Sequence, residues 1–176
     1  MDEKVSTTAP GAKRPQHWPT DYDAIVEPLT PLIDVQLLEH PVEPGSVEPF
    51  PTAAGAECIF LGRTRREVHS EHGQLSRLYY EAYVPLAEKQ LRELASQAIT
   101  RFGCLVVRIH HAIGEVPLGK ASVYVQVVCG HRDSAFDACR FLINQLKATV
   151  PIWKREIWAD GETWSGGTAV VVKEDE

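Results

Sequence analysis

Short apolar runs alternate along this chain with two longer stretches in which apolar residues recur at helical spacing. The short runs occupy residues 32–38, 56–61, 75–83, 105–110, 121–128 and 152–158, with 168–172 as a possible last one. Their valine, isoleucine, leucine and aromatic residues, bounded by glycine and proline, predict strands. Turn signals at Gly114 and 117–119 separate two of these runs, so we expect 105–110 and 121–128 to pair as antiparallel strands.

The two longer stretches predict helices. The first has Pro85 in its first turn, where a missing backbone N–H is tolerated, and it ends at Gly103. The second begins near Asp133 or Ser134, either of which can cap it, and Pro151 forbids its continuation. The order of elements predicts an α+β domain with a largely antiparallel sheet and two main helices.

The ends of the chain differ from its middle. Residues 1–30 combine repeated prolines with polar and charged residues, so we expect a loose N-terminal extension there. A single domain is expected over 31–172, followed by an acidic tail at 173–176. No apolar run approaches the roughly 20 residues of a membrane-spanning helix, and the N-terminal segment lacks the apolar centre of a secretory signal. We therefore expect a cytoplasmic protein.

The formal net charge of -6 conceals an uneven distribution, because both ends are acidic while residues 58–172 are mildly basic. This balance suits a small anionic ligand held by a local basic cluster, and it falls far short of the basic surface that nucleic acid requires. The four cysteines form no CxxC pair, and we interpret them as small buried hydrophobic residues. The histidines lack the spacing of a metal site, which argues against a zinc hydrolase and predicts no metal or bound cofactor.

Two groups of basic residues could bind a phosphate. His131 and Arg132 stand immediately before the second predicted helix, whose first turn presents unpaired N–H groups and a partial positive charge. The stretch 62–66 (Gly-Arg-Thr-Arg-Arg) offers guanidinium groups that match phosphate oxygens in paired hydrogen bonds. Phe60, just before it, could pack against a flat heterocycle or belong to the core. Taken singly, each group is also compatible with an ordinary surface.

Two lysines flank Pro151. Lys147 ends the second predicted helix and Lys154 opens the following strand, so a chain that reverses at the proline can bring both to one pocket. Two ammonium groups in one pocket disfavour each other's charge, which makes a neutral amine available as a nucleophile or proton acceptor, and together they attract anions. Alternatively, Lys147 merely complements the helix dipole and residues 154–156 form an exposed basic patch.

Taken together, these motifs resemble the large subunit of molybdopterin synthase over roughly residues 55–164. The matching segments are 55–65 (GAECIFLGRTR), 78–83 (LYYEAY), 130–136 (GHRDSAF) and 146–147 (LK) followed by 151–156 (PIWKRE). The last is the most diagnostic, because a proline, an aromatic residue and Lys-Arg-Glu at a fixed distance from a helix-ending lysine rarely arise by chance.

The resemblance implies an α/β hammerhead fold and a central homodimer that binds one ubiquitin-like sulfur-carrier subunit per protomer, forming a heterotetramer. It implies a sulfurtransferase of molybdenum cofactor biosynthesis. The carrier's C-terminal Gly-Gly thiocarboxylate enters a pocket, and sulfur passes in two rounds to cyclic pyranopterin monophosphate to form the molybdopterin dithiolene. The family's catalytic lysines correspond to Lys147 and Lys154. Its substrate-binding and pocket residues correspond to Arg65, His131, Arg132, Phe60 and Glu156.

The chain departs from the family pattern at residue 112. Members commonly carry arginine between a histidine and an Ile-Gly-Glu turn, whereas this chain has Ala112 after His111, so one anion contact is missing and His111 is assigned no role. The loop at 66–73 and the N-terminal extension have no assigned family counterpart. The alternative function is a non-catalytic binding module for a ubiquitin-like sulfur carrier, which the missing arginine favours and the two retained lysines oppose.

Overall fold

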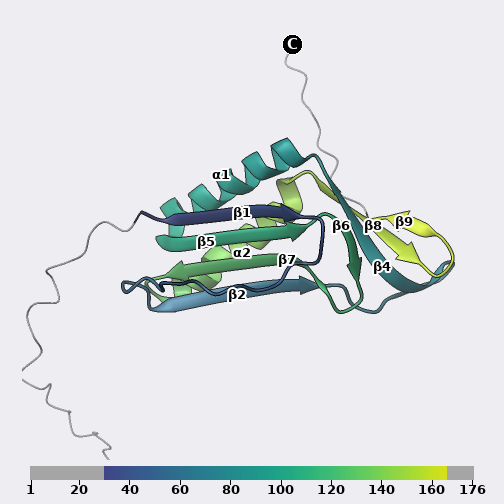
Figure 1. Ribbon diagram of the computed structural model, residues 1–176, viewed down its shortest axis with the longest axis horizontal. Coiled ribbons are helices and arrows are strands. Elements are labelled where there is room, and N and C mark those ends of the chain that lie inside the picture. The colour runs from purple at the N-terminus through teal and green to yellow at the C-terminus, as the bar shows by residue number, and fades with distance from the viewer. Residues whose placement is uncertain (1–29, 166–176) are drawn as a thin grey trace, which may run out of the picture.

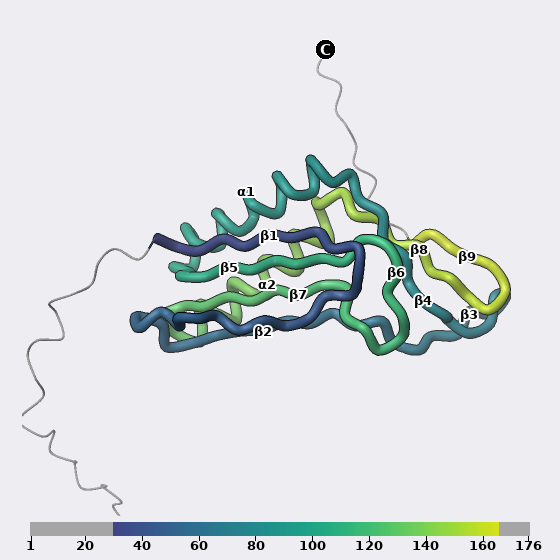
Figure 2. Tube along the Cα trace, in the orientation of Figure 1, coloured from purple at the N-terminus to yellow at the C-terminus, as the bar shows by residue number. Residues whose placement is uncertain are grey.

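The computed structural model describes residues 30–165, which form two β-sheets and two helices (Figure 1). The strands are β1 (Leu32–Leu38), β2 (Ala56–Arg63), β3 (Val68–His69), β4 (Gly73–Ala82), β5 (Cys104–Ala112), β6 (Gly114–Pro117), β7 (Ala121–Cys129), β8 (Ile152–Trp158) and β9 (Glu162–Trp164). The helices are α1 (Val84–Phe102) and α2 (Arg132–Thr149). The Cα trace in Figure 2 shows the smaller sheet standing beyond one end of the larger one.

The larger sheet has the strand order β1-β5-β7-β2, and both helices pack on the same face of it. Strand β7 pairs antiparallel with β5 and with β2, whereas β1 runs parallel to β5. Every residue of β7 is buried, as expected for a central strand covered on both faces. The main core lies between this sheet and the helices, where side chains such as Leu91, Ile109 and Leu142 are fully buried.

The second sheet has more strands, most of them shorter, and is called the smaller sheet here. Its order is β3-β4-β8-β9, and β6 pairs with β4 on the edge opposite β8. Strand β6 follows β5 directly, because Gly114 has a φ of 88°, a left-handed conformation that glycine adopts without strain. Strand β6 is thus the link between the two sheets. The smaller sheet lies against one end of the larger sheet. At this end β2, β5 and α2 finish and β7 begins (Figure 1).

The helix ends show which sequence signals decided the fold. Helix α1 has Pro85 in its first turn and ends at Gly103, whose φ of 66° is left-handed, as predicted. Helix α2 begins slightly earlier than predicted. His131 takes the N-cap position with an extended backbone and no side-chain cap, so the prediction that Asp133 or Ser134 caps this helix was wrong. Asp133 lies within the first turn, where its negative charge complements the helix dipole.

The predicted α+β class, with a largely antiparallel sheet and two main helices, is confirmed, as is the antiparallel pairing of the runs at 105–110 and 121–128. Strands β3, β6 and β9 escaped prediction because two to four residues are too few to show alternation. The possible strand at 168–172, the acidic tail and residues 1–29 of the expected extension lie outside the described residues. Neither described helix has the length and apolar character needed to cross a membrane.

Candidate functional site

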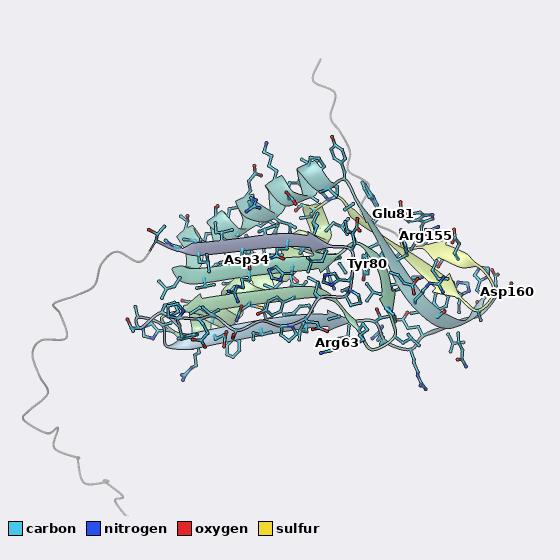
Figure 3. All side chains as sticks on the ribbon, in the orientation of Figure 1. Asp34, Arg63, Tyr80, Glu81, Arg155 and Asp160 are labelled. Carbon is cyan, nitrogen blue, oxygen red and sulfur yellow. The ribbon has the colours of Figure 1, made fainter. Side chains whose placement is uncertain are left out.

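A cavity of about 430 Å³ lies where the two sheets meet. It is lined by Gly62, Arg63, Thr64, Arg65, Glu67, Leu75, Leu78, Tyr80, His111, Ser122, Val123, Leu146, Lys147, Ile152, Lys154, Glu156 and Ser165. These residues come from the ends of β2, β5 and α2, from the start of β7 and from the inner face of the smaller sheet. The labels of Arg63 and Tyr80 in Figure 3 mark this junction.

Both lysines beside the proline bend line this cavity. Lys147 lies in the last turn of α2, and the chain turns at Val150 and Pro151 into β8. Successive strand residues face opposite sides, so Lys154 and Glu156 lie on the cavity side of β8 while Trp153 and Arg155 lie on the other. The expectation that a reversal at Pro151 brings the two amines to one pocket agrees with this geometry.

Lys154 is held by an ion pair within the cavity. Its Nζ lies 2.9 Å from Oε1 of Glu156. Burial of the Glu156 carboxyl group pushes its pKa up, but contacts with Lys154, Thr163 and Ser165 outweigh burial and leave the pKa below its usual range. Glu156 is therefore a carboxylate at neutral pH. Among the residues that the structure describes, Lys147 makes no ion pair, so its amine has no such neutralising partner.

The buried His111 and the half-buried Tyr80 form a wall of the cavity that the sequence did not predict. The His111 ring meets Tyr80 edge-on with the ring centroids 5.0 Å apart, and its Nδ1 lies 2.8 Å from the carbonyl oxygen of Ala112. That contact is a hydrogen bond only when Nδ1 carries the proton, which leaves Nε2 of the neutral ring as an acceptor. Burial lowers the pKa of His111 to about 4, and the positive charge of Lys147 acts in the same direction. Tyr80 donates a hydrogen bond to Ser122 Oγ over 3.1 Å.

The arginines at the end of β2 form the basic rim of the cavity. Arg63 donates a hydrogen bond from Nη1 to the carbonyl oxygen of Gly119 over 3.0 Å. The buried Thr64 lies between the two arginines and is held by backbone hydrogen bonds. Its N–H donates to the carbonyl oxygen of Lys120, and its own carbonyl oxygen accepts from the N–H of Gly119. Arg65 is exposed and pairs with Glu67 over 2.7 Å. The predicted substrate binder Arg65 therefore lines the same cavity as the two lysines.

His131 and Arg132 lie elsewhere in this chain. They line a separate pocket with Gly55, Gly130 and Asp133 at the N-terminus of α2. Lys147 stands at the opposite end of that helix, about 22 Å away at the usual helical rise. Within one chain, His131 and Arg132, which the resemblance makes substrate binders, therefore do not share a cavity with the two lysines. Helix length alone separates them.

Phe60 also lies outside the set of residues that line the cavity. It is half-buried and packs against the main core, on the side of β2 that faces the helices. The family arginine that this chain lacks would fall at Ala112, which is fully buried in a small cluster with Val116 and Tyr124. The replacement therefore removes no side chain from the cavity as it stands in this chain.

A signal for His111 existed in the sequence. It stands one residue before the buried end of β5, next to the Ile-Gly-Glu turn that redirects the chain into β6. Because strand ends meet at a sheet edge, a histidine there is a candidate pocket residue. Over the described residues, no group of three or more histidine, cysteine or acidic side chains could hold a metal ion. All four cysteines are free thiols.

The comparison with protein families gives a match over much of the described domain. The family model described as MoaE protein matches residues 35–149. The molybdopterin synthase catalytic subunit of Arabidopsis thaliana is 38% identical over 120 residues, which are 68% of this chain and 60% of that protein. The chain thus spans less than two thirds of that relative's length.

Several solved structures share this fold, and two of them are compared with it as follows. The crystal structure of molybdopterin synthase from Staphylococcus aureus superposes with a TM-score of 0.66 at 31% identity, covering 74% of this chain and 95% of the other. A complex of subunits 1 and 2 of the molybdopterin-converting factor from Helicobacter pylori superposes with a TM-score of 0.60, covering 74% and 89%. At 18% identity, this second likeness concerns the fold alone.

Proposed function

Because the chain belongs to the MoaE protein family, we propose that it is the catalytic subunit of a molybdopterin synthase. In this proposal it transfers sulfur from the C-terminal thiocarboxylate of a small ubiquitin-like carrier protein to cyclic pyranopterin monophosphate, in two rounds that yield the dithiolene. The observation that carries the proposal is that Lys147 and Lys154, from α2 and β8, line one cavity together with Arg65.

The charges of the cavity suit two anions, a thiocarboxylate and a phosphate. Two of its cationic side chains already have partners, because Lys154 pairs with Glu156 and Arg65 pairs with Glu67. Lys147 has no ion-pair partner among the described residues, so an arriving anionic tail meets an ammonium group that it does not have to displace from a carboxylate. We assign the first contact with the thiocarboxylate to Lys147 for this reason.

The two lysines have different tasks in this proposal. Lys147 contacts the carrier's carbonyl carbon and sulfur and moves protons as that centre changes hybridisation. Lys154 stays charged beside Glu156 and stabilises the negative charge that builds on the pterin intermediate, because a fixed ammonium in a partly buried site needs little rearrangement. Arg65 at the rim holds the phosphate with paired N–H donors.

Replacing Lys147 tests the proposal directly. With thiocarboxylated carrier and the pterin precursor, Lys147→Ala should lose dithiolene formation by a factor of about 100 or more, while carrier affinity by titration calorimetry stays within a few-fold. Lys89→Ala is the matched control, because Lys89 is an exposed lysine on α1, away from the cavity. Full activity of Lys147→Ala would remove this residue from the mechanism. Carrier binding without any product from the natural chain would instead identify a non-catalytic binding module.

The positions of His131 and Arg132 add a homodimer to the proposal. The family resemblance makes them substrate binders, yet about 22 Å of helix separates them from Lys147. A second copy of the chain, with the N-terminus of its α2 at the cavity, would bring both sets of groups to one phosphate. The proposed assembly is a homodimer that binds one carrier per protomer. Its proposed location is the cytoplasm, and cell fractionation can test this location.

Mixing two inactive variants tests this arrangement. Lys147→Ala and Arg132→Ala chains should each have low activity alone. After co-expression, a mixed dimer contains one site with both natural residues, so activity should return to a substantial fraction of the natural level. If activity does not recover although mixed dimers form, Arg132 acts within its own chain. Full activity of Arg132→Ala alone would mean that Arg132 has no part in catalysis.

A further inference from the structure

One strand of the smaller sheet carries a row of polar side chains that ends in the core. Lys154, Glu156 and Trp158 alternate along β8 and therefore share its cavity-facing side. Strand β9 pairs antiparallel with β8, and Thr163 stands directly opposite Glu156. Thr163 is thus within reach of both the carboxylate and the indole ring two residues further along β8.

These side chains form a hydrogen-bond chain with a fixed direction. The indole Nε1–H of Trp158 donates to Thr163 Oγ1 over 2.8 Å, and Thr163 Oγ1 lies 3.1 Å from Glu156 Oε2. An indole nitrogen can only donate, so the threonine hydroxyl accepts from it and has its single proton free for the carboxylate. The other carboxylate oxygen, Oε1, lies 2.9 Å from Lys154 Nζ.

Trp158, at the far end of this series of hydrogen bonds, is fixed by packing. The Trp158 side chain is 6% exposed and packs with Leu75 and Leu78 in a small core beneath the smaller sheet. The His69 ring covers it at a centroid distance of 5.2 Å. A large ring enclosed in this way has one orientation, so its N–H points at Thr163 in a constant direction.

We propose that Thr163 and Trp158 are positioning residues of the sulfur-transfer site, which hold the Glu156 carboxylate at both oxygens and thereby fix Lys154 in the cavity. The inference rests on the proposed function, because it concerns where the second catalytic lysine stands. A carboxylate bound at one oxygen only can turn about its terminal bond and carry the ammonium group with it. The bond from Thr163 at Oε2 restricts that rotation, and the Ser165 side chain is a further contact of the same carboxylate.

Two substitutions of nearly equal size separate the hydroxyl from its packing. Thr163→Val keeps the shape and removes the hydroxyl, whereas Thr163→Ser keeps the hydroxyl. Thr163→Val should lower kcat for dithiolene formation about tenfold, the typical effect of losing one hydrogen bond to a charged group, and leave KM for the carrier within about twofold. Thr163→Ser should restore kcat to within about threefold of the natural chain. Equal losses in both variants would overturn the proposal.

A double-mutant cycle shows whether the effect runs through the carboxylate. If Thr163 acts by holding Glu156, Thr163→Val should cost little further activity once Glu156→Gln has weakened the pair with Lys154. Losses that multiply independently would mean that Thr163 does not act through Glu156. Trp158→Phe, which retains a buried ring but lacks the N–H, should change kcat in the same direction as Thr163→Val.

A measurement without turnover separates this inference from the proposed function. In carbon-13 NMR titrations, Thr163→Val should raise the pKa of the Glu156 carboxyl group, because a donor to the carboxylate is lost. The other charged or titratable groups around it are unchanged in that variant: Lys154, Tyr80, Lys147, His111, Arg63, Arg65 and Glu67. An unshifted titration would refute the positioning role. Suppose that the natural chain makes no product while Thr163→Val still shifts the titration of Glu156. The proposed function is then refuted, and the hydrogen bonds from Trp158 through Thr163 to Glu156 are supported.

Discussion

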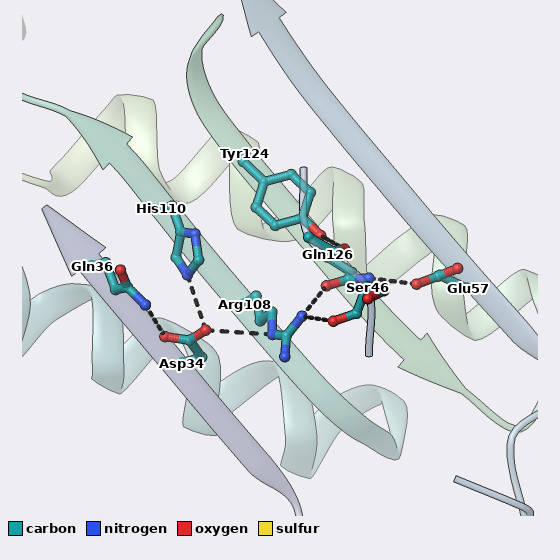
Figure 4. A network of polar contacts seen from close by, with 9 residues as sticks. Asp34, Gln36, Ser46, Glu57, Arg108, His110, Tyr124 and Gln126 are labelled. Atoms are coloured by element: carbon teal, nitrogen blue, oxygen red, sulfur yellow. Dashed lines mark hydrogen bonds and ion pairs between the residues drawn. The ribbon is translucent and has the colours of Figure 1, made fainter. Parts of the chain in front are cut away.

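A polar network on the face of the larger sheet opposite the helices allows a stability prediction to be worked through (Figure 4). Asp34 on β1 pairs with Arg108 Nε over 3.4 Å and with His110 Nε2 over 3.0 Å, both from the neighbouring parallel strand. Arg108 also donates from Nη1 to the carbonyl oxygen of Ser46 over 2.6 Å, in the segment that crosses the sheet. The carboxylate thus organises a contact between the sheet and that segment.

Asp34→Asn keeps the size of the side chain and removes its charge. The side chains of Arg108 and His110 are only 17% and 14% exposed, so water compensates their lost partner incompletely. We expect the free energy of unfolding to fall by about 1–3 kcal/mol at pH 7, the range for losing a hydrogen-bonded partner of a partly buried charge. Urea unfolding followed by tryptophan fluorescence measures this difference.

The same network fixes the sign of the pH dependence. Burial raises the pKa of Asp34, but the hydrogen bond from Gln36 and the close His110 and Arg108 side chains outweigh it, so the folded pKa lies below the unfolded value. A depressed carboxyl pKa contributes stability that is fully present above the unfolded pKa of about 3.9 and is lost as pH falls through the folded pKa. The gap between the natural chain and Asp34→Asn should therefore shrink below about pH 4.

A matched control removes the same charge at an exposed position. Asp133 pairs with Arg132 at 3.8 Å, its side chain is 89% exposed and it lies in the first turn of α2, so Asp133→Asn should change the free energy of unfolding by less than about 1 kcal/mol. The reasoning about Asp34 would be refuted by an Asp34→Asn cost equal to that of the control. A cost that stays constant from pH 7 to pH 3 would equally refute it.

Three further predictions concern other sites. Gly55→Ala should lower the free energy of unfolding by about 1–3 kcal/mol in urea titrations, because its Cβ would lie 2.5 Å from the carbonyl oxygen of Gly130, whereas Gly45→Ala meets nothing closer than 3.7 Å and should be neutral. Burial raises the pKa of the Cys139 thiol to about 12, so mass spectrometry should find its alkylation at pH 8 at least about tenfold slower in the folded protein than in urea. Burial is the main cause that lowers the pKa of His111 to about 4, below the unfolded value of about 6.5. The free energy of unfolding should therefore fall as pH drops from about 6.5 toward about 4, and urea unfolding midpoints should show a smaller loss for His111→Gln.

Local signals in the sequence were sufficient for the long elements. Pro85 and Gly103 bounded α1, and Pro151 ended α2, because these residues restrict the backbone whatever surrounds them. The parallel pairing of β1 with β5 was not predictable in this way. It joins strands far apart in the sequence, and the apolar pattern of β1 is the same for either direction.

The sequence grouped residues correctly in space where one turn decided the geometry, and wrongly where a whole element intervened. Lys147 and Lys154 flank a single reversal, so their shared cavity followed from Pro151. His131 was grouped with them by chemistry, but α2 separates it from Lys147 by its full length. The contact of Thr163 with Glu156 was not predicted, because it depends on cross-strand register, which no local pattern specifies.

The balance of charge in the cavity explains why its two lysines need not be equivalent. The described residues that line the cavity include four cationic side chains, of Arg63, Arg65, Lys147 and Lys154, and two carboxylates, of Glu67 and Glu156, so this lining carries excess positive charge. Both carboxylates are committed at short distances, to Arg65 and to Lys154. The uncompensated charge therefore falls on Arg63, which donates to the carbonyl oxygen of Gly119, and on Lys147, at the C-terminal end of α2, where the helix dipole stabilises an ammonium group. In the proposed function, an anionic tail entering the cavity neutralises the charge of Lys147, and for this reason we assign Lys147 to the sulfur donor and Lys154 to the acceptor.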